Sequence, residues 1–146
     1  MADFMTPGQR SSQMAKVRSK NSKIELLVRR ELHRAGYRYR LHDPKLPGRP
    51  DLVFASRRCV IFINGCFWHA HDCSLGNRVP KSNTEFWSQK RLRNRERDAA
   101  QRKQLSLLGW QALDVWECEL KAAPELTFNT VQTFLAEAYR RHRVEW

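Results

Sequence analysis

A short segment of the chain gathers residues that bind transition metals. Residues 64–73 read "NGCFWHAHDC", which places Cys66, His71 and Cys73 close together. Zinc takes four ligands in a tetrahedron, and thiolate and imidazole groups are its usual donors. Cys118, in "VWECEL" at the end of the last predicted strand, can supply the fourth ligand. These residues predict a structural zinc site, and the alternative is that some of them are merely buried thiols.

A second group of side chains has the types needed to hold a hard cation and to move a proton. Asp51 begins the run "DLVF", Glu25 lies at the rim of the apolar stripe of an earlier helix, and His69 follows a β-rich run. If these elements meet at one edge of a sheet, the carboxylates can hold Mg²⁺ and the histidine can activate water against a phosphodiester. The residue types alone equally allow a turn aspartate, a solvated glutamate and a structural histidine.

The elements that position these groups follow from hydrophobic periodicity and turn signals. The expected order is α-β-β-β-α-β-α, over residues 22–36, 37–41, 51–54, 59–63, 84–108, 110–116 and 124–141. The first helix buries a face made of Ile24, Leu27, Val28, Leu32 and Ala35. Thr84 is the expected N-cap of the long helix, Gly109 ends it, and Cys59 is expected in the core. Because a helix crosses between the third and fourth strands, these can pair in parallel, which predicts an α/β fold with a mixed sheet covered by helices.

Composition limits the class of protein. The chain has 146 residues, 41% of them hydrophobic, which fits one domain over 21–146 preceded by a polar arm over 1–20. The net charge of +12 calls for an anionic partner, usually nucleic acid and less often an acidic membrane surface. We see no apolar run of about 20 residues and no hydrophobic signal core, so a cytosolic protein is expected. In that compartment, cysteines bind metal or stay reduced more often than they form disulfides.

Several motifs in this order resemble the very short patch repair (Vsr) endonucleases. They are "LPGRPDLVF", "RCVIFINGCFWH", "TEFW", "NRERD" and "GWQALDVWECEL", and the resemblance runs from about residue 11 to 120. It implies the restriction-endonuclease-like α/β fold of the PD-(D/E)xK type. It also implies an enzyme that nicks DNA beside a T:G mismatch left by deamination of 5-methylcytosine, with catalytic Mg²⁺ and a structural zinc.

The resemblance assigns roles to the metal-binding and proton-moving residues. Asp51 corresponds to the main Mg²⁺ ligand, with the backbone carbonyl of Ile63 as a second. His69 corresponds to the general base that activates water. The zinc held by the cysteines and His71 would support this site without taking part in the reaction.

Two further acids complete the expected catalytic group. Glu25 matches an acid of the first helix in type and place, and we expect it to bind a metal-bound water. Asp98, in "NRERD", would orient His69 as a carboxylate fixes an imidazole tautomer. The alternative for Asp98 is an ion pair along the helix with Arg95 or Arg102, at spacings of three and four.

The adjacent rings of Phe67 and Trp68 raise a separate question, since only one of them can easily face a core. The resemblance implies that both enter the DNA beside the mismatched pair, with Trp87 stacking alongside and Met14 of the arm wedged from the opposite groove. Unstacking a base step costs a few kcal/mol, and a mismatch lowers that cost. The alternative for the two rings is ordinary core packing.

One departure from the family bears on activity. Members carry His or Asp where this chain has Asn64, and a neutral amide cannot act as a base. The acid-then-lysine pattern of the wider fold is also absent, with Ile61 and Ile63 in its place. Catalysis would therefore depend on Asp51, Mg²⁺ and His69. Two functions stay open: a mismatch-specific nicking endonuclease, and a mismatch-binding protein that cuts weakly or not at all.

The expected partner is double-stranded DNA with a T:G mismatch, with mismatch-repair proteins as candidate further partners and no membrane. We expect a monomer in the bacterial cytoplasm that acts on the nucleoid.

Overall fold

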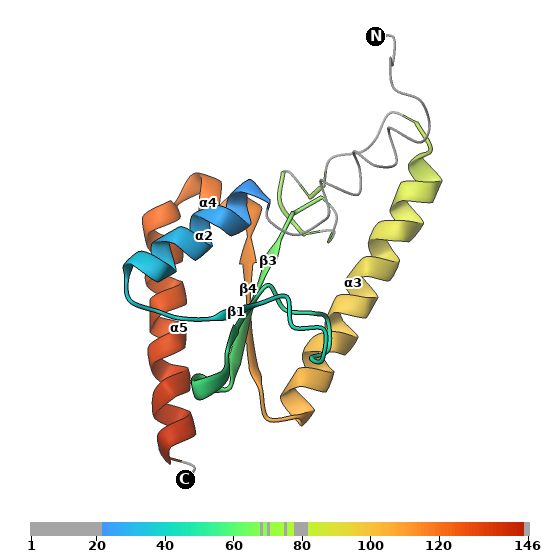
Figure 1. The fold of residues 1–146 in the computed structure, drawn as a ribbon. Helices are drawn as coiled ribbons and strands as arrows, with labels where there is room; N and C mark the ends of the chain where they lie inside the picture. Colours follow the sequence, from blue (N-terminus) through green and yellow to red (C-terminus); the bar gives the residue numbers. More distant parts are fainter. Residues whose placement is uncertain (1–21, 68, 70, 75, 78–81, 145–146) are drawn as a thin grey trace.

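The computed structural model describes residues 22–67, 69, 71–74, 76–77 and 82–144 as a layered α/β structure (Figure 1). Its elements, in chain order, are α2 (Lys23–Arg34), β1 (Arg40–Leu41), β2 (Leu52–Phe54), η1 (Ala55–Arg57), β3 (Cys59–Asn64), α3 (Thr84–Leu107), β4 (Gln111–Trp116), α4 (Glu117–Ala122) and α5 (Pro124–Val144). All seven predicted elements are present. The short helices η1 and α4 were not predicted.

A four-stranded mixed sheet lies at the centre, in the order β1-β2-β3-β4. β1 pairs antiparallel with β2, and β2 pairs antiparallel with β3. β3 and β4 run parallel, from Cys59 opposite Gln111 to Asn64 opposite Trp116. The predicted parallel pair across the helical crossover is confirmed. Because β3 and the edge strand β4 are parallel, their carboxyl ends lie at the same edge of the sheet, where the candidate zinc ligands follow them in sequence.

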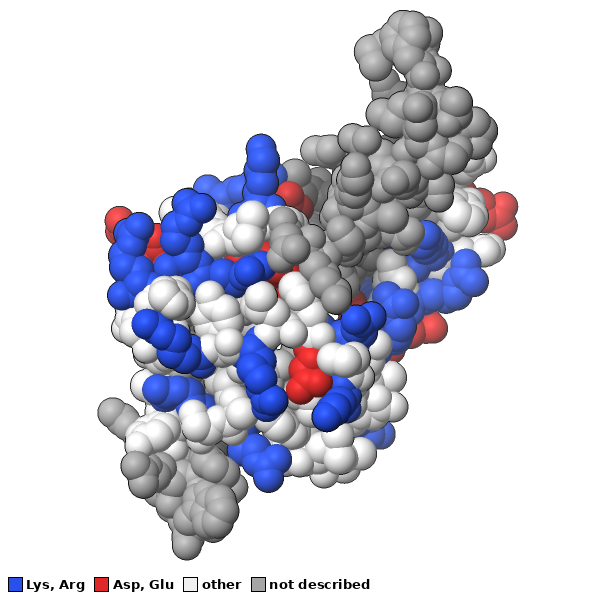
Figure 2. Space-filling view, in the orientation of Figure 1, with Lys and Arg blue, Asp and Glu red and all other residues white. Residues whose placement is uncertain are grey.

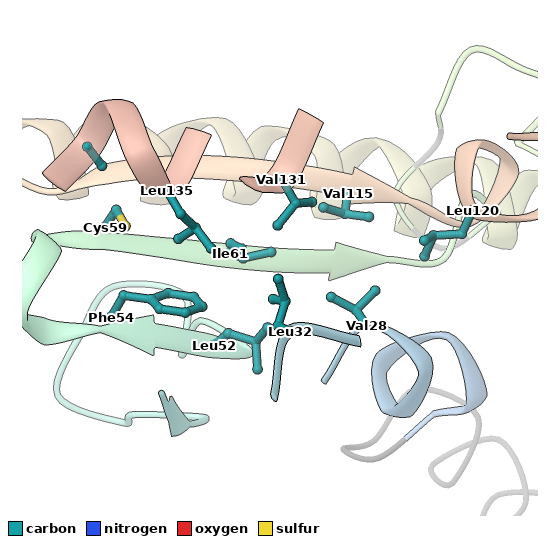
Figure 3. Packing of buried hydrophobic residues seen from close by; sticks show 11 residues of the cluster. Val28, Leu32, Leu52, Phe54, Cys59, Ile61, Val115, Leu120, Val131 and Leu135 are labelled. Carbon is teal, nitrogen blue, oxygen red and sulfur yellow. The ribbon is translucent and has the colours of Figure 1, made fainter. Parts of the chain in front are cut away.

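Both faces of the sheet are covered by helices, with α2 and α5 on one side and α3 on the other (Figure 1). This explains the unbroken apolar run of β3, since both of its sides are buried. Cys59 and Ile61 face the α2 and α5 side (Figure 3), whereas Val60 and Phe62 pack with Leu105 of α3. Cys59 is fully buried, so its assignment to the core is confirmed.

The buried face of α2 differs from the predicted one. Leu27 is 38% exposed, whereas Glu25 is only 3% exposed and lies on the buried side with Val28 and Leu32. Apolar periodicity placed Leu27 and Ala35 inside, and this part of the prediction is wrong, because both residues are exposed. A carboxylate can take the place of an apolar side chain only when hydrogen bonds offset its lost hydration. Glu25 has such partners in the site described below.

Two element boundaries also differ from expectation. The strand predicted over 37–41 is reduced to β1, because Tyr39 turns its ring onto Phe54 and its hydroxyl donates to a backbone carbonyl of α2 at 2.7 Å. Asn83, with a φ of 54°, holds the N-cap position of α3 that was predicted for Thr84. The first difference reflects contacts of Tyr39 with other elements, which strand preferences do not include.

Helix α3 is 24 residues long and buries only Leu105 fully. It extends past the sheet and presents basic side chains to solvent (Figures 1 and 2). Its basic residues are Lys90, Arg91, Arg93, Arg95, Arg97, Arg102 and Lys103. Within the described ranges, no helix combines the length and the apolar character that a membrane crossing requires.

Candidate active site and metal cluster

The four predicted zinc ligands come together beyond the carboxyl ends of β3 and β4. Ligand atoms of Cys66, His71, Cys73 and Cys118 all lie within 4.8 Å of one another. Cys118 follows the last strand, as expected, and is the second residue of α4, a short helix that was not predicted. The chain turns into a helix directly after Trp116, and the backbone N–H of Cys118 donates to the sulfur of Cys66 at 3.3 Å.

Three sulfurs and one imidazole are a donor set that fits tetrahedral zinc. Burial acts to raise the pKa of Cys73, but hydrogen bonds, first among them that from the Gly76 N–H at 3.2 Å, lower it to about 7. Burial raises the pKa of Cys66 to about 12 and raises that of Cys118 as well. A bound cation would stabilise the thiolate forms of these cysteines, so the cluster is a candidate metal site.

Asp51 lies directly before β2, where three elements bring polar side chains together. Its Oδ2 accepts a hydrogen bond from the backbone N–H of Ile63 at 2.7 Å, and its Oδ1 lies 3.7 Å from Nε2 of His42. The same ring nitrogen lies 2.9 Å from Oε1 of Glu25. Ligand atoms of Glu25, His42 and Asp51 all fall within 4.8 Å of one another. The structure thus joins the predicted pair of carboxylates through a histidine.

Opposing effects of the surroundings set the pKa of Asp51. Burial, followed by the neighbouring Glu25 carboxylate, raises the pKa of Asp51 to about 7. The Ile63 N–H and the positive charge of Arg102 act in the opposite direction. Two carboxylates this close repel each other, and a divalent cation between them would relieve that repulsion. The oxygen donors therefore fit Mg²⁺, which prefers such ligands. Ile63 contacts Asp51 through its backbone N–H. Its backbone carbonyl remains a predicted ligand of Mg²⁺.

His69 lies in the loop after β3 and meets helix α3. Its Nδ1 forms a short hydrogen bond with Oδ2 of Asp98. Asp98 therefore pairs with His69 instead of forming the ion pair considered along the helix, and Arg102 pairs with Asp114. The edge of Trp116 packs near the imidazole, at 6.2 Å between ring centroids. A histidine whose Nδ1 donates to a carboxylate keeps its Nε2 able to accept a proton.

A cavity of about 270 Å³ lies beside this pair. Its lining residues are His69, His71, Asp72, Arg95, Asp98, Ala99, Arg102, Asp114 and Trp116. Arg102 lines this cavity, and its charge also acts on Asp51. The His69–Asp98 pair and the group around Asp51 therefore lie near each other at one edge of the sheet.

Asn64 is buried, 3% exposed, at the end of β3. Its Nδ2 donates to Oδ1 of Asp114 at 2.8 Å. Asp114 also accepts from Nε of Arg102 at 3.2 Å, and the guanidinium of Arg102 lies 3.3 Å from the centroid of the Phe62 ring. The amide group is thereby oriented by a fixed acid, which leaves Asn64 able to accept a hydrogen bond through its oxygen.

Two of the four residues expected to enter DNA, Phe67 and Trp87, lie within the described part of the chain. Phe67 is half-buried and lies 6.1 Å from Trp87 between ring centroids, with the guanidinium of Arg91 at 4.8 Å from the Phe67 ring. Trp68 and Met14 lie outside the described residues. Phe67 and Trp87 thus form an aromatic pair at the start of α3, outside both core clusters.

Sequence reasoning missed His42, Asp114 and Arg102. His42 directly follows β1, which pairs with β2, and this adjacency to Asp51 was the available signal. Asp114 interrupts the apolar strand "QALDVW", and an acid in a partly buried strand signals a partner. Nothing in the local sequence indicated that Arg102 would be this partner.

Comparison with known proteins identifies the family. The family model for the DNA mismatch endonuclease Vsr matches residues 2–75. The chain is 49% identical over 120 residues to the type II nicking enzyme V.XorIIP of Xanthomonas oryzae pv. oryzae, covering 82% of this chain and 88% of that protein. It is 46% identical over 121 residues to V.NmeAIP of Neisseria meningitidis, covering 83% and 86%. It is also 42% identical over 137 residues to the DNA mismatch endonuclease Vsr of Escherichia coli, covering 94% and 87%. With these matches beside the geometry above, the chain belongs to the Vsr family of DNA mismatch endonucleases, to which the type II nicking enzymes are related.

Proposed function

We propose that this protein nicks one strand of DNA on the 5′ side of the thymine in a T:G mismatch, leaving a 5′-phosphate and starting very short patch repair. Family membership supports DNA as the substrate and nicking as the reaction. The observation that carries the proposal is the pairing of His69 with Asp98 beside the group around Asp51, two acid–base units at one sheet edge. A cation held by a carboxylate and a base that activates water can together catalyse hydrolysis of a phosphodiester.

In this proposal the side chains divide the work. Asp98 holds the Nδ1 proton of His69, so Nε2 takes the proton from the attacking water. Asp51, with the Ile63 carbonyl, would hold Mg²⁺, and Glu25 would bind a metal-bound water. When bound, Mg²⁺ polarises the phosphate and offsets the developing negative charge.

The remaining parts support DNA recognition. We propose that Cys66, His71, Cys73 and Cys118 hold a structural zinc, which stiffens the loop that carries Phe67 and Trp68. Trp87 would stack beside these rings, and Met14 of the arm over 1–20 would enter from the other groove. The body over 21–146 would form one restriction-endonuclease-like domain.

Strand cleavage of a labelled duplex with a single T:G pair, in the presence of Mg²⁺, tests the proposal. The wild-type protein should nick, whereas Asp51→Asn should abolish nicking and leave binding largely intact, because a charge facing the phosphates is removed. Asp43→Asn, a change at a loop aspartate that accepts from the Lys45 N–H, is the matched control and should nick normally. Equal nicking rates for wild type and Asp51→Asn would show that the active site lies elsewhere.

A second candidate function is mismatch binding with weak cutting. Asn64 favours it, because its amide is neutral and its Nδ2 is committed to Asp114 at 2.8 Å. Asn64→His separates the two candidates, since an imidazole N–H can still donate to Asp114 while the other nitrogen adds a base. A higher nicking rate in this variant identifies Asn64 as the limiting residue, and an unchanged or lower rate argues that the native site is complete without it.

A further inference from the structure

The backbone of His42 adopts a conformation that residues other than glycine seldom have. Its φ is 49°, in the left-handed region, and its backbone N–H donates to the carbonyl of Asp51 at 3.2 Å. Only 9% of its side chain is exposed. Such backbone strain in a non-glycine residue persists only where surrounding contacts determine it, and it concentrates at ligand sites. The turn after β1 therefore aims the imidazole at the two carboxylates.

Each carboxylate has one oxygen held by a donor and the other facing His42. Oε2 of Glu25 is bound by Nη1 of Arg29 at 3.1 Å, and Oδ2 of Asp51 is bound by the Ile63 N–H at 2.7 Å. Oε1 of Glu25 and Oδ1 of Asp51 lie 2.9 and 3.7 Å from Nε2 of His42. Two oriented oxygens and one ring nitrogen, from three elements of the fold, therefore converge within 4.8 Å.

This donor set differs from an all-oxygen magnesium site. Mg²⁺ prefers oxygen ligands, whereas first-row transition ions such as Mn²⁺ also accept imidazole. The hydrogen bonds from Arg29 and from the Ile63 N–H resemble the outer contacts that orient carboxylate ligands around a metal ion. If His42 served only to keep the two acids apart, Oε1 of Glu25 and Oδ1 of Asp51 would not both need to face the same ring nitrogen.

Resting on the proposed function, we propose that His42 is an additional ligand of the catalytic cation and that its nitrogen shifts the preference of the site from Mg²⁺ towards Mn²⁺. The metal would replace the hydrogen bond between His42 and Glu25, with Nε2 of His42 joining Oδ1 of Asp51 and the Ile63 carbonyl as protein donors and Oε1 of Glu25 facing a metal-bound water.

The experiment measures Mn²⁺ and Mg²⁺ binding to the zinc-loaded full-length protein without DNA, by calorimetry and by electron paramagnetic resonance of Mn²⁺. His42→Gln should weaken Mn²⁺ about 10-fold or more and Mg²⁺ by less than about 3-fold, since the loss of the ring nitrogen costs the transition ion more than the harder ion. Bound Mn²⁺ should show ¹⁴N modulation in the spin-echo signal of the wild type, and this modulation should be lost in the variant. His33→Gln, an exposed histidine of α2, is the matched control and should change neither affinity.

Equal weakening of both ions would overturn the proposal, because it would mean that His42 only positions the carboxylates. Unchanged Mn²⁺ affinity, absence of ¹⁴N modulation in the wild type, or no Mn²⁺ binding at all would overturn it as well. These results are independent of the nicking assay, in which failure of the proposed function would appear as cleavage by Asp51→Asn.

Discussion

The histidine next to helix α3 has its two ring nitrogens in different environments. Nδ1 of His69 is engaged by Asp98, and the ring lines a cavity of about 270 Å³ that also holds Arg95 and Arg102. The carboxylate fixes the tautomer, and the cations can attract phosphate. A base with one nitrogen oriented by an acid, beside a cavity lined by arginines as well as aspartates, suits the activation of water against a phosphodiester.

Removal of this base gives the first prediction. His69→Ala should lower the nicking rate by about 10²–10⁴-fold, the usual contribution of a general base, while affinity for mismatched DNA stays nearly constant. Asp98→Asn should lower the rate less, because the imidazole is kept and only its orientation suffers. Single-turnover nicking and fluorescence anisotropy measure the two quantities. His33→Ala serves as control, and a full nicking rate in His69→Ala would rule out the assigned base.

The raised pKa of Asp51 predicts a pH dependence of stability. The carboxyl titrates near 3.8 when unfolded and near 7 in the folded protein, so the folded state binds the proton more tightly and loses stability as pH rises through this window. Asp51→Asn mimics the neutral acid. The variant should therefore match the wild type near pH 4 and exceed its unfolding free energy by an amount on the order of 1–4 kcal/mol at pH 8.

Urea unfolding at several pH values, without added divalent cations, measures this difference. Because the cysteine cluster is common to both proteins, its titration cancels in the comparison. A difference that stays constant from pH 4 to pH 8 would contradict the raised pKa.

At the scale of elements, the loop after β3 and the start of α4 depend on each other. Cys66 and Cys118 meet through a backbone N–H, and Oε1 of Glu117 accepts from the N–H of Cys66 at 3.3 Å. Few apolar contacts support this loop, because Cys66 is its only residue in the buried apolar set among those described. A bound metal would therefore contribute a large share of its stability, and with it the position of His69 and Phe67.

The zinc prediction follows at this scale. Cys73→Ser should lower the zinc content well below one ion per chain and also lower the melting temperature, since structural zinc contributes directly to folding. Cys59→Ala is the matched control: it removes a buried core thiol outside the cluster, so stability should fall while zinc content stays at one. Elemental analysis and thermal unfolding provide the two readouts. A fully folded wild-type protein without zinc would contradict the prediction.

For the whole molecule, charge is the dominant feature. The net charge of +12 is spread over the surface, with Lys and Arg outnumbering acids on the face seen in Figure 2 and along α3. Such a surface attracts the DNA backbone without reading sequence, so in the proposed function discrimination of a mismatch would come from the rings near the start of α3 and from base contacts.

The corresponding prediction concerns salt. Affinity for duplex DNA should fall steeply as salt rises, with a log–log slope of about −0.9 for each phosphate neutralised. The T:G duplex should bind more tightly than a matched duplex of the same sequence at every salt concentration, because a mismatch is easier to unstack. Anisotropy titrations from low to physiological salt measure both. Equal affinities for the two duplexes throughout would argue against mismatch recognition.

Local patterns in the sequence determined most of the architecture. The apolar run of β3 and the crossover before β4 predicted the parallel pair, the helix over Lys23–Arg34 followed from periodicity, and Gly109 marked the end of the helix over Thr84–Leu107. The grouping of Cys66, His71 and Cys73 was predicted because three of the four residues lie in one loop. These features depend on neighbours in the chain, which a sequence displays directly.

Only the tertiary structure decided which distant side chains meet. Glu25 is buried although helix periodicity put Leu27 inside, because His42, from another element, provides its partner. Asn64 is tied to Asp114 across the parallel strands, and Arg102 reaches the same acid from α3. Hydrogen bonds between elements depend on register and packing, which propensities do not encode. The candidate cation site and the environment of Asn64 are therefore properties of the folded chain.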